Sequence, residues 1–350
     1  MQIEEIIANI PPLDEAAMQS ARARQDRLTK PRGSLGRLEE LSIQLAGMRA
    51  DPLPAVERKA VIVMAADHGV AREGVSAYPA EVTAQMVLNF LRGGAAINVL
   101  ARQAGARVTV VDIGVAVEFE QTPGLVRRKV MCGTRNQAEG PAMTRAEAEQ
   151  AIQVGLDVLS EEAAHGLDIV ATGDMGIGNT TPSSAIVAAM TGLPVAQVVG
   201  RGTGIDDQGL ERKIKVIEKS LAVNQPDRND PMDVLHKVGG LEIAGLTGVM
   251  LGAASQRIPV VVDGFISTAA ALIAVALAPR AREYLISAHQ SVEIGHQVML
   301  KHLNLVPLLD LNLRLGEGTG AALAFSLIEA STRLLREMAT FDEAGVSDKE

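Results

Sequence analysis

One glutamate of this chain lies in a setting suited to general-base chemistry. Glu317 is flanked by glycines in the run Arg314-Leu315-Gly316-Glu317-Gly318-Thr319-Gly320, ahead of an Ala-rich segment. Backbone geometry fixes a carboxylate in such a run while its small neighbours leave room for a substrate, and apolar surroundings raise a carboxyl pKa toward neutrality. A Glu near a helix start is also a favourable partner for the helix dipole, and the motif taken alone favours that explanation.

A glycine-rich turn at residues 173–182 has the features of an anion site. It reads Gly173-Asp174-Met175-Gly176-Ile177-Gly178-Asn179-Thr180-Thr181-Pro182, between a predicted strand and a predicted helix. The glycines permit close backbone approach, either threonine can cap the helix, and the proline suits its first turn. Free N–H groups at such a helix start bind phosphate. An ordinary strand-to-helix turn explains the glycines equally well, since the spacing matches neither a dinucleotide fingerprint nor a Walker loop.

A second glycine cluster, Gly200-Arg201-Gly202-Thr203-Gly204, could form a backbone nest for an anion, with Lys213 supplying positive charge. Lys213 belongs to the charged run Glu211-Arg212-Lys213-Ile214-Lys215. Runs of this kind usually form a solvated helix face. The residues alone therefore favour a solvated Lys213.

Histidine and cysteine spacing gives no metal site. His68 and His289 lie at predicted strand ends, whereas the other four histidines are scattered through polar segments, and no HExxH motif is present. Cys132 is the single cysteine, which excludes intramolecular disulfides and multi-thiolate metal sites. We expect Cys132 to be a small buried hydrophobe.

The elements that position these residues follow from composition and periodicity. Of 350 residues, 47% are hydrophobic and 21% charged, which excludes a disordered chain. Short β-branched runs alternate with longer Ala-rich segments and predict an α/β fold, a parallel sheet with helices on both faces. The predicted strands are Ala60–Met64, Val108–Val111, Leu167–Val170, Pro259–Val262 and Tyr284–Ile286, with weaker candidates near 127–132 and 196–199.

Acidic residues stand at the ends of several predicted strands, namely Asp67, Asp112, Asp174 and Asp263. In open parallel sheets, ligands bind beyond the carboxyl ends of the strands. These aspartates therefore predict the rim of an active site.

The two chain ends read as helical. Before residue 50 one helix face carries Leu38, Leu41, Leu45 and Met48, behind a possible Ser34 N-cap. We expect residues 1–50 and 320–350 to form a small helical subdomain beside a large domain of residues 51–319.

Charge and composition restrict the partners and the location. The formal net charge is −9, aromatic residues are 2%, and Trp is absent, so nucleic acid is not an expected partner. The apolar stretch Ile258–Ala278 is interrupted by Asp263 and predicts a strand and a helix, not a membrane span. The acidic start lacks the basic region of a secretory signal, and we expect a cytoplasmic protein.

Taken in order, the motifs resemble those of the nicotinate-nucleotide:dimethylbenzimidazole phosphoribosyltransferase family, which makes the lower-ligand nucleotide of cobalamin. The resemblance runs over nearly the whole chain, and ordered agreement across this many separate motifs is highly specific. The matching motifs are Lys30-Pro31-Arg32-Gly33-Ser34-Leu35-Gly36-Arg37-Leu38-Glu39, Ala66-Asp67-His68-Gly69-Val70, Gly176-Ile177-Gly178-Asn179-Thr180-Thr181, Asn224-Gln225-Pro226, Lys237-Val238-Gly239-Gly240, Asp263-Gly264-Phe265 and Arg314-Leu315-Gly316-Glu317-Gly318.

The resemblance implies an activity and an architecture. The activity is transfer of phosphoribose from nicotinate mononucleotide to 5,6-dimethylbenzimidazole, giving α-ribazole 5′-phosphate and nicotinate. The architecture is a Rossmann-like large domain, a small helical domain from the two chain ends, and a homodimer. Neither a cofactor nor a metal is implied.

The resemblance also implies site residues. Glu317 falls on the family's catalytic base, and Tyr78 and Met86 fall in the segment lining the benzimidazole pocket. Asp174 falls where the family usually has Glu; it is shorter by roughly 1.3 to 1.5 Å, and either acts through a water or shifted loop or supports the loop. The segments that bind the phosphoribosyl group contain Gly176, Gly178, Asn179, Thr180, Gly202, Gly204 and Lys213.

The chemistry agrees with this resemblance. Cleavage of the N-glycosidic bond neutralises the pyridinium, so departure of nicotinate needs no pyrophosphate-binding Mg²⁺, and a base that removes the second azole proton relieves the charge of attack. Two alternatives stay open. A nicotinamide-dependent dehydrogenase should carry Gly-x-Gly-x-x-Gly where this chain has Asp67-His68-Gly69-Val70, and a non-catalytic nucleotide-binding protein does not need Glu317.

Overall fold

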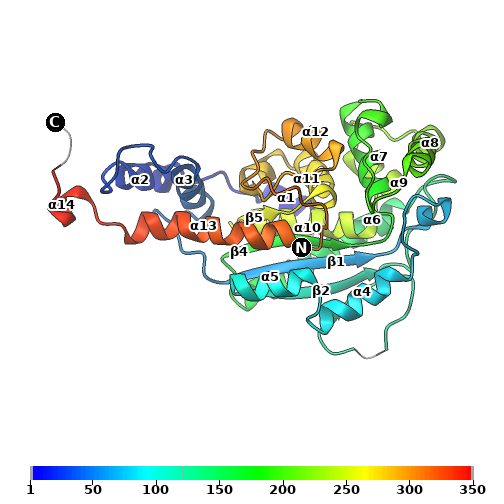
Figure 1. Cartoon of the computed structure of the whole chain (residues 1–350), viewed down its shortest axis with the longest axis horizontal. Coiled ribbons are helices and arrows are strands. Elements are labelled where there is room, and N and C mark those ends of the chain that lie inside the picture. The colour runs from blue at the N-terminus through cyan, green and yellow to red at the C-terminus, as the bar shows by residue number, and fades with distance from the viewer. Residues whose placement is uncertain (1–2, 121, 348–350) are drawn as a thin grey trace.

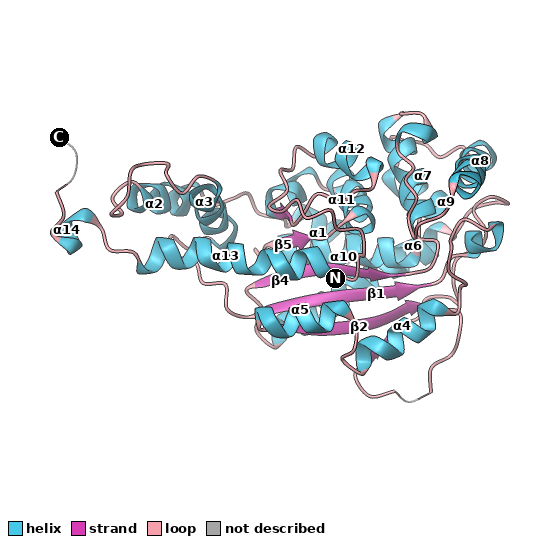
Figure 2. Ribbon diagram, in the orientation of Figure 1, coloured by secondary structure: helices cyan, strands magenta, loops and turns pink. Residues whose placement is uncertain are grey.

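Six parallel strands form the central sheet. The computed structural model describes residues 3–120 and 122–347. The strands lie in the order β3-β2-β1-β4-β5-β6, and each neighbouring pair is parallel (Figure 2). This doubly wound order reverses between β1 and β4, which leaves a crevice at the carboxyl ends of the strands. The bounds are β1 Lys59–Ala66, β2 Ala106–Gly114, β3 Leu125–Arg127, β4 Ile169–Met175, β5 Val260–Val262 and β6 Leu285–Ser287.

Helices cover both faces of this sheet, so the predicted α/β fold is confirmed. Helices α4, α5 and α13 lie against one face, while α6 and α10 pack against each other on the opposite face (Figure 1). All eight residues of β1 are buried, as a parallel sheet covered on both faces requires. The helix bounds are α1 Ile3–Ala8, α2 Glu15–Gln25, α3 Arg37–Arg49, α4 Val82–Leu91, α5 Ala96–Ala104, α6 Arg145–Ala164, α7 Thr180–Thr191, α8 Asp207–Asn224, α9 Pro231–Val238, α10 Leu241–Ser255, α11 Phe265–Leu277, α12 Ile294–His302, α13 Thr319–Glu337 and α14 Phe341–Ala344.

The five main strand predictions are confirmed, since each overlaps one of β1, β2, β4, β5 and β6. The weaker candidate near 127–132 corresponds only to the short strand β3, at one edge of the sheet. The candidate near 196–199 is wrong. Residues Val195–Gln197 form a 3-10 turn. The apolar run there is short, and Pro194 before it has no N–H to donate to a neighbouring strand.

Helix α13 runs from the sheet toward the N-terminal helices. It contacts β4, β5 and α5, and also α2 and α3, and Figure 1 shows α14 beyond its far end. Of the apolar face predicted before residue 50, α3 buries Leu41, Leu45 and Met48 and leaves Leu38 half-buried, and Ser34 is not the cap. Tight turns between Pro31 and Gly36 delay the helix to Arg37, with Gly36 at the N-cap position.

The subdomain division at residues 50 and 320 stays a prediction, and residues 1–2 and 348–350 of it lie outside the described part of the chain. The stretch Ile258–Ala278 forms β5 followed by α11, as predicted. No helix within residues 3–120 and 122–347 is both long enough and apolar enough to cross a bilayer.

Candidate active site

A cavity of about 470 Å³ opens at the carboxyl end of the sheet. Its walls come from the segments that follow β4, β5 and β6, from α4 and the residues before it, from the turn at Gly202 and Thr203, and from the loop before α13. The topology therefore collects residues distant in sequence at the crevice that a doubly wound sheet provides. Of the four rim aspartates predicted from the sequence, Asp174 lines this cavity, while Asp67, Asp112 and Asp263 are buried outside its lining.

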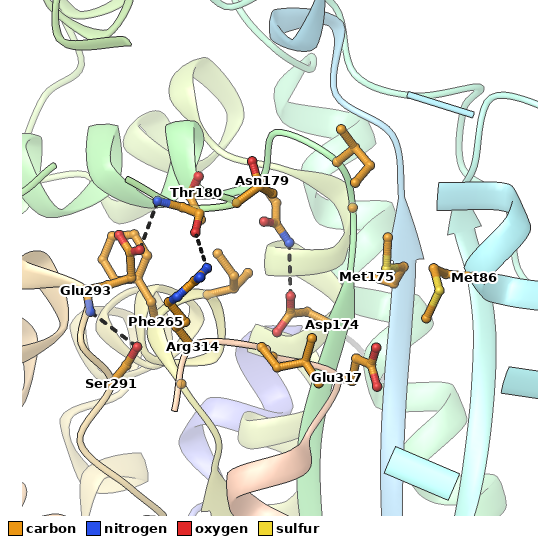
Figure 3. Close-up of a pocket in the computed structure, with 18 of the residues that line it drawn as sticks. Met86, Asp174, Met175, Asn179, Thr180, Phe265, Ser291, Glu293, Arg314 and Glu317 are labelled. Atoms are coloured by element: carbon orange, nitrogen blue, oxygen red, sulfur yellow. Dashed lines mark hydrogen bonds between the residues drawn. The ribbon is translucent and has the colours of Figure 1, made fainter. Parts of the chain in front are cut away.

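The cavity has an apolar half and a polar half. Met86 and Met175 lie together on one side (Figure 3), and Tyr78, Val82 and Ile177 are further apolar residues of the lining. Ser291, Glu293 and Arg314 lie on the other side, with Thr180 and the ring of Phe265 (Figure 3), and the Gly202 N–H donates to Glu293 there. Asp174 and Asn179 stand between the two groups in this view. One flat apolar ligand and one polar ligand could thus meet beside a carboxyl group.

Glu317 reaches the cavity from the loop before α13. Its backbone is left-handed, with φ 63°, and its side chain is 6% exposed. The Ile97 N–H donates to Oε2 at 3.3 Å. Burial raises the pKa of Glu317, assisted by the charge of Asp263 and opposed by the Ile97 N–H. A carboxylate with a raised pKa and one oxygen that accepts no hydrogen bond from the described residues is a better proton acceptor than an ordinary one.

Asp174 is the last residue but one of β4 and is equally buried, at 6% exposed. Its Oδ2 accepts a hydrogen bond from Asn179 Nδ2 at 2.9 Å. Burial raises the pKa of Asp174 well above its usual value, and the charges of Asp263 and Glu242 add to that effect. Asp174 and Glu317 are thus two carboxyls with raised pKa values in the lining of one cavity.

The turn at residues 173–182 begins α7, but its caps differ from the prediction. Asn179 occupies the N-cap position, and its side chain donates to Asp174 instead of capping. Thr180 and Thr181 are the first two helical residues, followed by Pro182 in the first turn as expected. The threonine caps predicted from the sequence are wrong, because the glycines move the helix start by one residue.

Lys213 is completely buried, so the solvated helix face favoured by its charged neighbours is wrong. Its Nζ donates to Thr180 Oγ1 at 2.7 Å and to the Gly200 carbonyl at 3.2 Å. Burial lowers the pKa of Lys213 to about 8, against the opposing charge of Glu293. Lys213 therefore supports both glycine-rich segments from behind the cavity wall.

Most of the residues singled out from the sequence converge on this cavity. Gly176, Asn179, Thr180, Gly202, Tyr78, Met86, Asp174 and Glu317 line it. Gly178, Gly204 and Lys213 are absent from its lining, although each belongs to or supports a segment that reaches it.

Sequence reasoning missed several polar lining residues. Arg314 lines the cavity, and its Nη1 donates to the Gly202 carbonyl at 3.3 Å. Glu293 Oε1 accepts the Gly202 N–H at 2.9 Å. Arg314 stands inside the Glu317 motif and could have been noticed there. Ser291 and Glu293 lie in a segment with no recognisable pattern.

Two other residues considered in the sequence, Cys132 and His68, lie outside the cavity lining. Cys132 is exposed, not buried, because it lies in a surface loop. His68 is fully buried, and its Nε2 lies 2.8 Å from Glu242 Oε1. Burial lowers the pKa of His68, but the charge and hydrogen bond of Glu242 outweigh it, and the net shift is upward.

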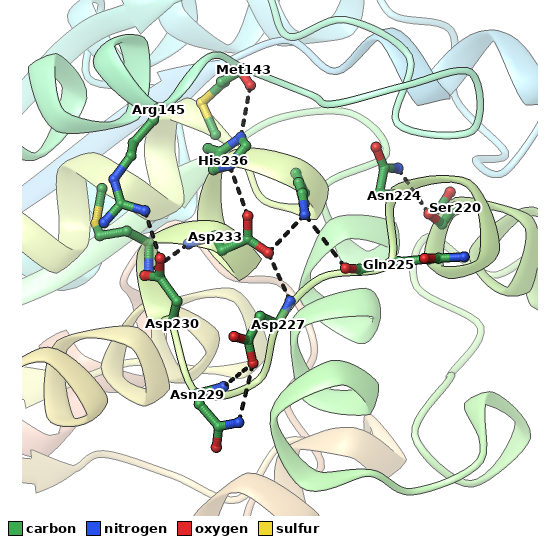
Figure 4. Close-up of polar contacts among 12 residues, drawn as sticks. Met143, Arg145, Ser220, Asn224, Gln225, Asp227, Asn229, Asp230, Asp233 and His236 are labelled. Carbon is green, nitrogen blue, oxygen red and sulfur yellow. Dashed lines mark hydrogen bonds and ion pairs between the residues drawn. The ribbon is translucent and has the colours of Figure 1, made fainter.

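The motifs Asn224-Gln225-Pro226 and Lys237-Val238-Gly239-Gly240 hold helices together (Figure 4). Asn224 Nδ2 donates to the Gln137 and Ser220 carbonyls at 2.7 and 2.8 Å. Lys237 Nζ donates to Asp233 Oδ2 at 2.9 Å and to the Gln225 carbonyl at 3.4 Å. These contacts fix the end of α8, the helix that carries Lys213.

Comparisons with known proteins agree with this site. A family model described as a phosphoribosyltransferase matches residues 10–346. The chain is 62% identical over 347 residues to the nicotinate-nucleotide–dimethylbenzimidazole phosphoribosyltransferase of Roseiflexus sp. (strain RS-1), covering 99% of this chain and 98% of that protein. It is 60% identical over 346 residues to the protein of that name from Geobacter sulfurreducens, covering 99% and 98%.

A solved structure is similar over the same extent. The crystal structure of CobT from Thermus thermophilus matches with a TM-score of 0.92 at 50% identity, covering 95% of this chain and 100% of that chain. Neither a dehydrogenase nor a non-catalytic nucleotide-binding protein is consistent with these relatives. The chain belongs to the nicotinate-nucleotide–dimethylbenzimidazole phosphoribosyltransferase family.

Proposed function

We propose that this chain transfers the phosphoribosyl group of nicotinate mononucleotide to 5,6-dimethylbenzimidazole. The products are α-ribazole 5′-phosphate and nicotinate, in the assembly of the nucleotide loop of cobalamin. The observation that carries this proposal is the divided cavity, in which an apolar wall and a polar wall meet beside Asp174 and Glu317. The family to which the chain belongs supports the choice of substrates.

The apolar half is the acceptor subsite. Tyr78 and Met86, with Met175 beside Met86, offer flat and adaptable apolar contacts to a benzimidazole ring. Glu317 lies at the edge of this half and is the base for the ring N–H. Its raised pKa suits that task, because a base with a pKa nearer the working pH accepts a proton more effectively.

The polar half is the donor subsite. The start of α7 binds the phosphoribosyl group through the segment that contains Gly176, Gly178, Asn179 and Thr180. The turn that contains Gly202 and Gly204 lies on the other side of that group. Lys213 contributes its charge through the Thr180 hydroxyl. Arg314 lines the cavity directly, and it pairs with an anionic group of the nucleotide.

The transfer is a displacement at the anomeric carbon. One benzimidazole nitrogen forms the new C–N bond while the bond to nicotinate breaks, and the electron pair of that bond neutralises the pyridinium nitrogen. Glu317 takes the proton from the other azole nitrogen. Attack opposite the leaving group converts the β configuration to α. Asp174 acts with Glu317 beside the reacting atoms, held there by Asn179.

The direct test is to mix the purified protein with both substrates. We expect nicotinate and α-ribazole 5′-phosphate in equal amounts, with the α anomer identified by nuclear magnetic resonance. Nicotinate release without the benzimidazole nucleotide would indicate a hydrolase instead. A panel of benzimidazoles, adenine and phenols then ranks the acceptor bases.

The chain is also proposed to be a cytoplasmic homodimer with a large domain of residues 51–319 and a helical subdomain from its ends. Exposed apolar side chains between residues 292 and 315, a stretch that also contributes Glu293, Arg314 and Leu315 to the cavity lining, support a subunit interface, namely Val292, Ile294, Val306, Leu311 and Leu315. Light scattering after size-exclusion chromatography should give twice the chain mass, and Leu311→Glu should shift it toward the monomer. A monomeric mass at micromolar concentration would contradict the dimer.

A further inference from the structure

Asp263 is a buried carboxyl that the transfer mechanism leaves without a task. It follows β5, is completely buried, and lies next to the cavity-lining residues Gly264 and Phe265. Its two oxygens accept backbone hydrogen bonds from the start of α13. The Gly318 N–H donates to Oδ2 at 3.2 Å, and the Ala321 N–H donates to Oδ1 at 2.9 Å. A side chain from another element thus caps α13, whose own N-cap residue is a glycine.

The capped turn contains the Glu317 backbone. Gly316, Glu317 and Gly318 have φ values of 85°, 63° and 93°, three successive residues in the left-handed region. A residue with a side chain adopts such a conformation only when its surroundings hold it there. Gly173 of β4 provides one restraint, because the Glu317 carbonyl packs where a Cβ would stand, 2.5 Å from that position. Asp263 provides the other restraint, through the amide that directly follows Glu317.

The ionisable groups that interact with Asp263 are His289, Asp174 and Glu317. His289 Nε2 lies 3.9 Å from Oδ1, and Thr172 Oγ1 accepts the Asp263 N–H at 3.3 Å. Burial raises the pKa of Asp263, while His289 and the amides of α13 favour the ionised form. The charge of Asp263 in turn contributes to the raised pKa values of Asp174 and Glu317.

We propose that Asp263 is a positioning residue for the transfer reaction: its carboxylate holds the first turn of α13 and so fixes the Glu317 carboxyl beside the acceptor base. The proposal rests on the proposed function for the role of Glu317, and on the two amide contacts for the role of Asp263. Asp263 itself does not line the cavity, which is why its role is one of positioning.

The test compares Asp263→Asn with Asp168→Asn. Asp168 is a matched control, since it is buried and accepts the Glu57 and Arg58 amides at 3.1 and 2.8 Å, just before β4 and so at the opposite end of the sheet. Asp263→Ser, which keeps one acceptor oxygen in a smaller volume, replaces Asp263→Asn if that variant does not fold. The measurements are kcat, both KM values, the pH profile and hydrogen exchange of residues 316–321.

We expect Asp263→Asn to lower kcat by a factor on the order of 10 to 10², with both KM values within about threefold of the unsubstituted enzyme. Its acidic pH limb should move to lower pH, because the charge of Asp263, which helps to raise the pKa of Glu317, is lost, while Asp174, the other carboxyl that interacts with Glu317, remains. Exchange of residues 316–321 should become faster in this variant alone. Asp168→Asn should lower thermal stability and leave kcat, the acidic limb and this exchange unchanged.

An unchanged kcat in folded Asp263→Asn or Asp263→Ser, or an equal loss of kcat in Asp168→Asn, would overturn the proposal. Hydrogen exchange keeps the two proposals separable. Absence of product from the unsubstituted enzyme would overturn the proposed function, whereas unchanged exchange of residues 316–321 in the Asp263 variants would overturn the positioning role whatever the reaction.

Discussion

The two carboxyls of the cavity are held in different ways. Glu317 accepts one backbone N–H and keeps an oxygen free, whereas Asp174 is tied to the side chain of Asn179. Burial is the main cause of the raised pKa in both. A free oxygen suits proton transfer, and a tethered one suits a supporting part beside it.

For Glu317, we expect the Gln variant to keep both substrates bound and to lower turnover by a factor on the order of 10² to 10⁴. Because the pKa of Glu317 lies above its usual 4.5 and the base must be ionised, kcat/KM of the unsubstituted enzyme should fall on the acidic side of a midpoint above 4.5. Glu337→Gln, at the exposed end of α13, is the control and should be fully active. Unchanged turnover in Glu317→Gln would remove Glu317 from the mechanism.

Asp174 can be tested by length and by charge. If it acts with Glu317, Asp174→Glu should preserve or raise activity, and Asp174→Ala should lower turnover with little change in melting temperature. If it only braces the turn, Asp174→Ala leaves the Asn179 amide without its partner, at a cost of about 1 to 3 kcal/mol, and should lower the melting temperature. We expect the first pair of results. A wild-type single-turnover rate for Asp174→Ala would exclude a catalytic part.

Lys213 should impose a basic limb on donor binding. Its pKa of about 8 means that the ammonium is present below pH 8 and lost above it, so kcat/KM for nicotinate mononucleotide should fall as pH rises through 8. Lys213→Met should weaken donor binding by about 10- to 100-fold, abolish that limb and leave benzimidazole binding intact. Lys215→Met changes an exposed lysine of the same helix and serves as the control. Equal loss for both ligands would contradict a local phosphate role.

For single residues, local sequence indicates the backbone setting but does not indicate which distant atoms surround the side chain. Glycine flanks singled out Glu317 as a candidate base, and Glu317 does line the cavity, but its role as the base stays a prediction. The surroundings of Lys213 come from Thr180 and Gly200, which are distant in sequence, so its charged neighbours pointed to solvent instead. Glu293 accepts a hydrogen bond from the Gly202 N–H, and no local sequence pattern predicts that contact.

Among the elements, β4 and α13 are coupled through close backbone packing. A Cβ at Gly173 would stand 2.5 Å from the Glu317 carbonyl oxygen and 2.9 Å from its carbon. These are backbone atoms, which cannot move aside as a flexible side chain can. The strand therefore sets how closely the loop of Glu317 can approach the sheet.

Gly173→Ala should displace the Glu317 loop. We expect the melting temperature to fall by about 2 to 5 °C and kcat by about tenfold, because overpacking strains the fold and shifts the base from its acceptor. Gly140→Ala is the control, since its added Cβ would meet nothing within 4 Å. Calorimetry and steady-state kinetics measure both effects. A fully active Gly173→Ala enzyme would show that the loop tolerates displacement.

Elements were predictable where their signals are long and local. Buried β-branched runs located five strands, because a parallel sheet covered on both faces needs continuous apolar segments. Strand β3 and the turn at residues 195–197 are three residues each, too short for periodicity to separate them. The start of α3 depends on turns within its preceding loop, so the Ser34 cap was misplaced.

For the molecule as a whole, the order of the strands follows from rules of handedness and layering more than from any single residue. Alternating strands and helices predicted the parallel sheet, and the sheet placed Asp174 and the residue after Asp263 at one edge. The cavity itself needed long-range contacts. Its polar wall joins the segments after β6 and before α13 to the α7 start, and only the folded chain brings these together.

Crowding buried carboxyls at this edge should affect the stability of the whole protein. A carboxyl whose folded pKa is raised binds its proton more tightly in the folded state, so it favours folding at low pH, and that advantage is lost as pH rises from its unfolded value near 3.8 through the folded pKa. Asp174→Asn removes this titration while keeping an acceptor for Asn179. The variant should therefore melt higher than the unsubstituted protein at pH 7.5, and the gap should shrink toward pH 4. His68 and His296 titrate in both proteins, so their contributions cancel in the difference.

Melting curves of both proteins from pH 4 to 8, with exposed Asp157→Asn as the control, measure the gap. A gap that stays constant with pH would show that Asp174 carries no raised pKa, and the proximity of Asp263 and Glu242 would then need another electrostatic account.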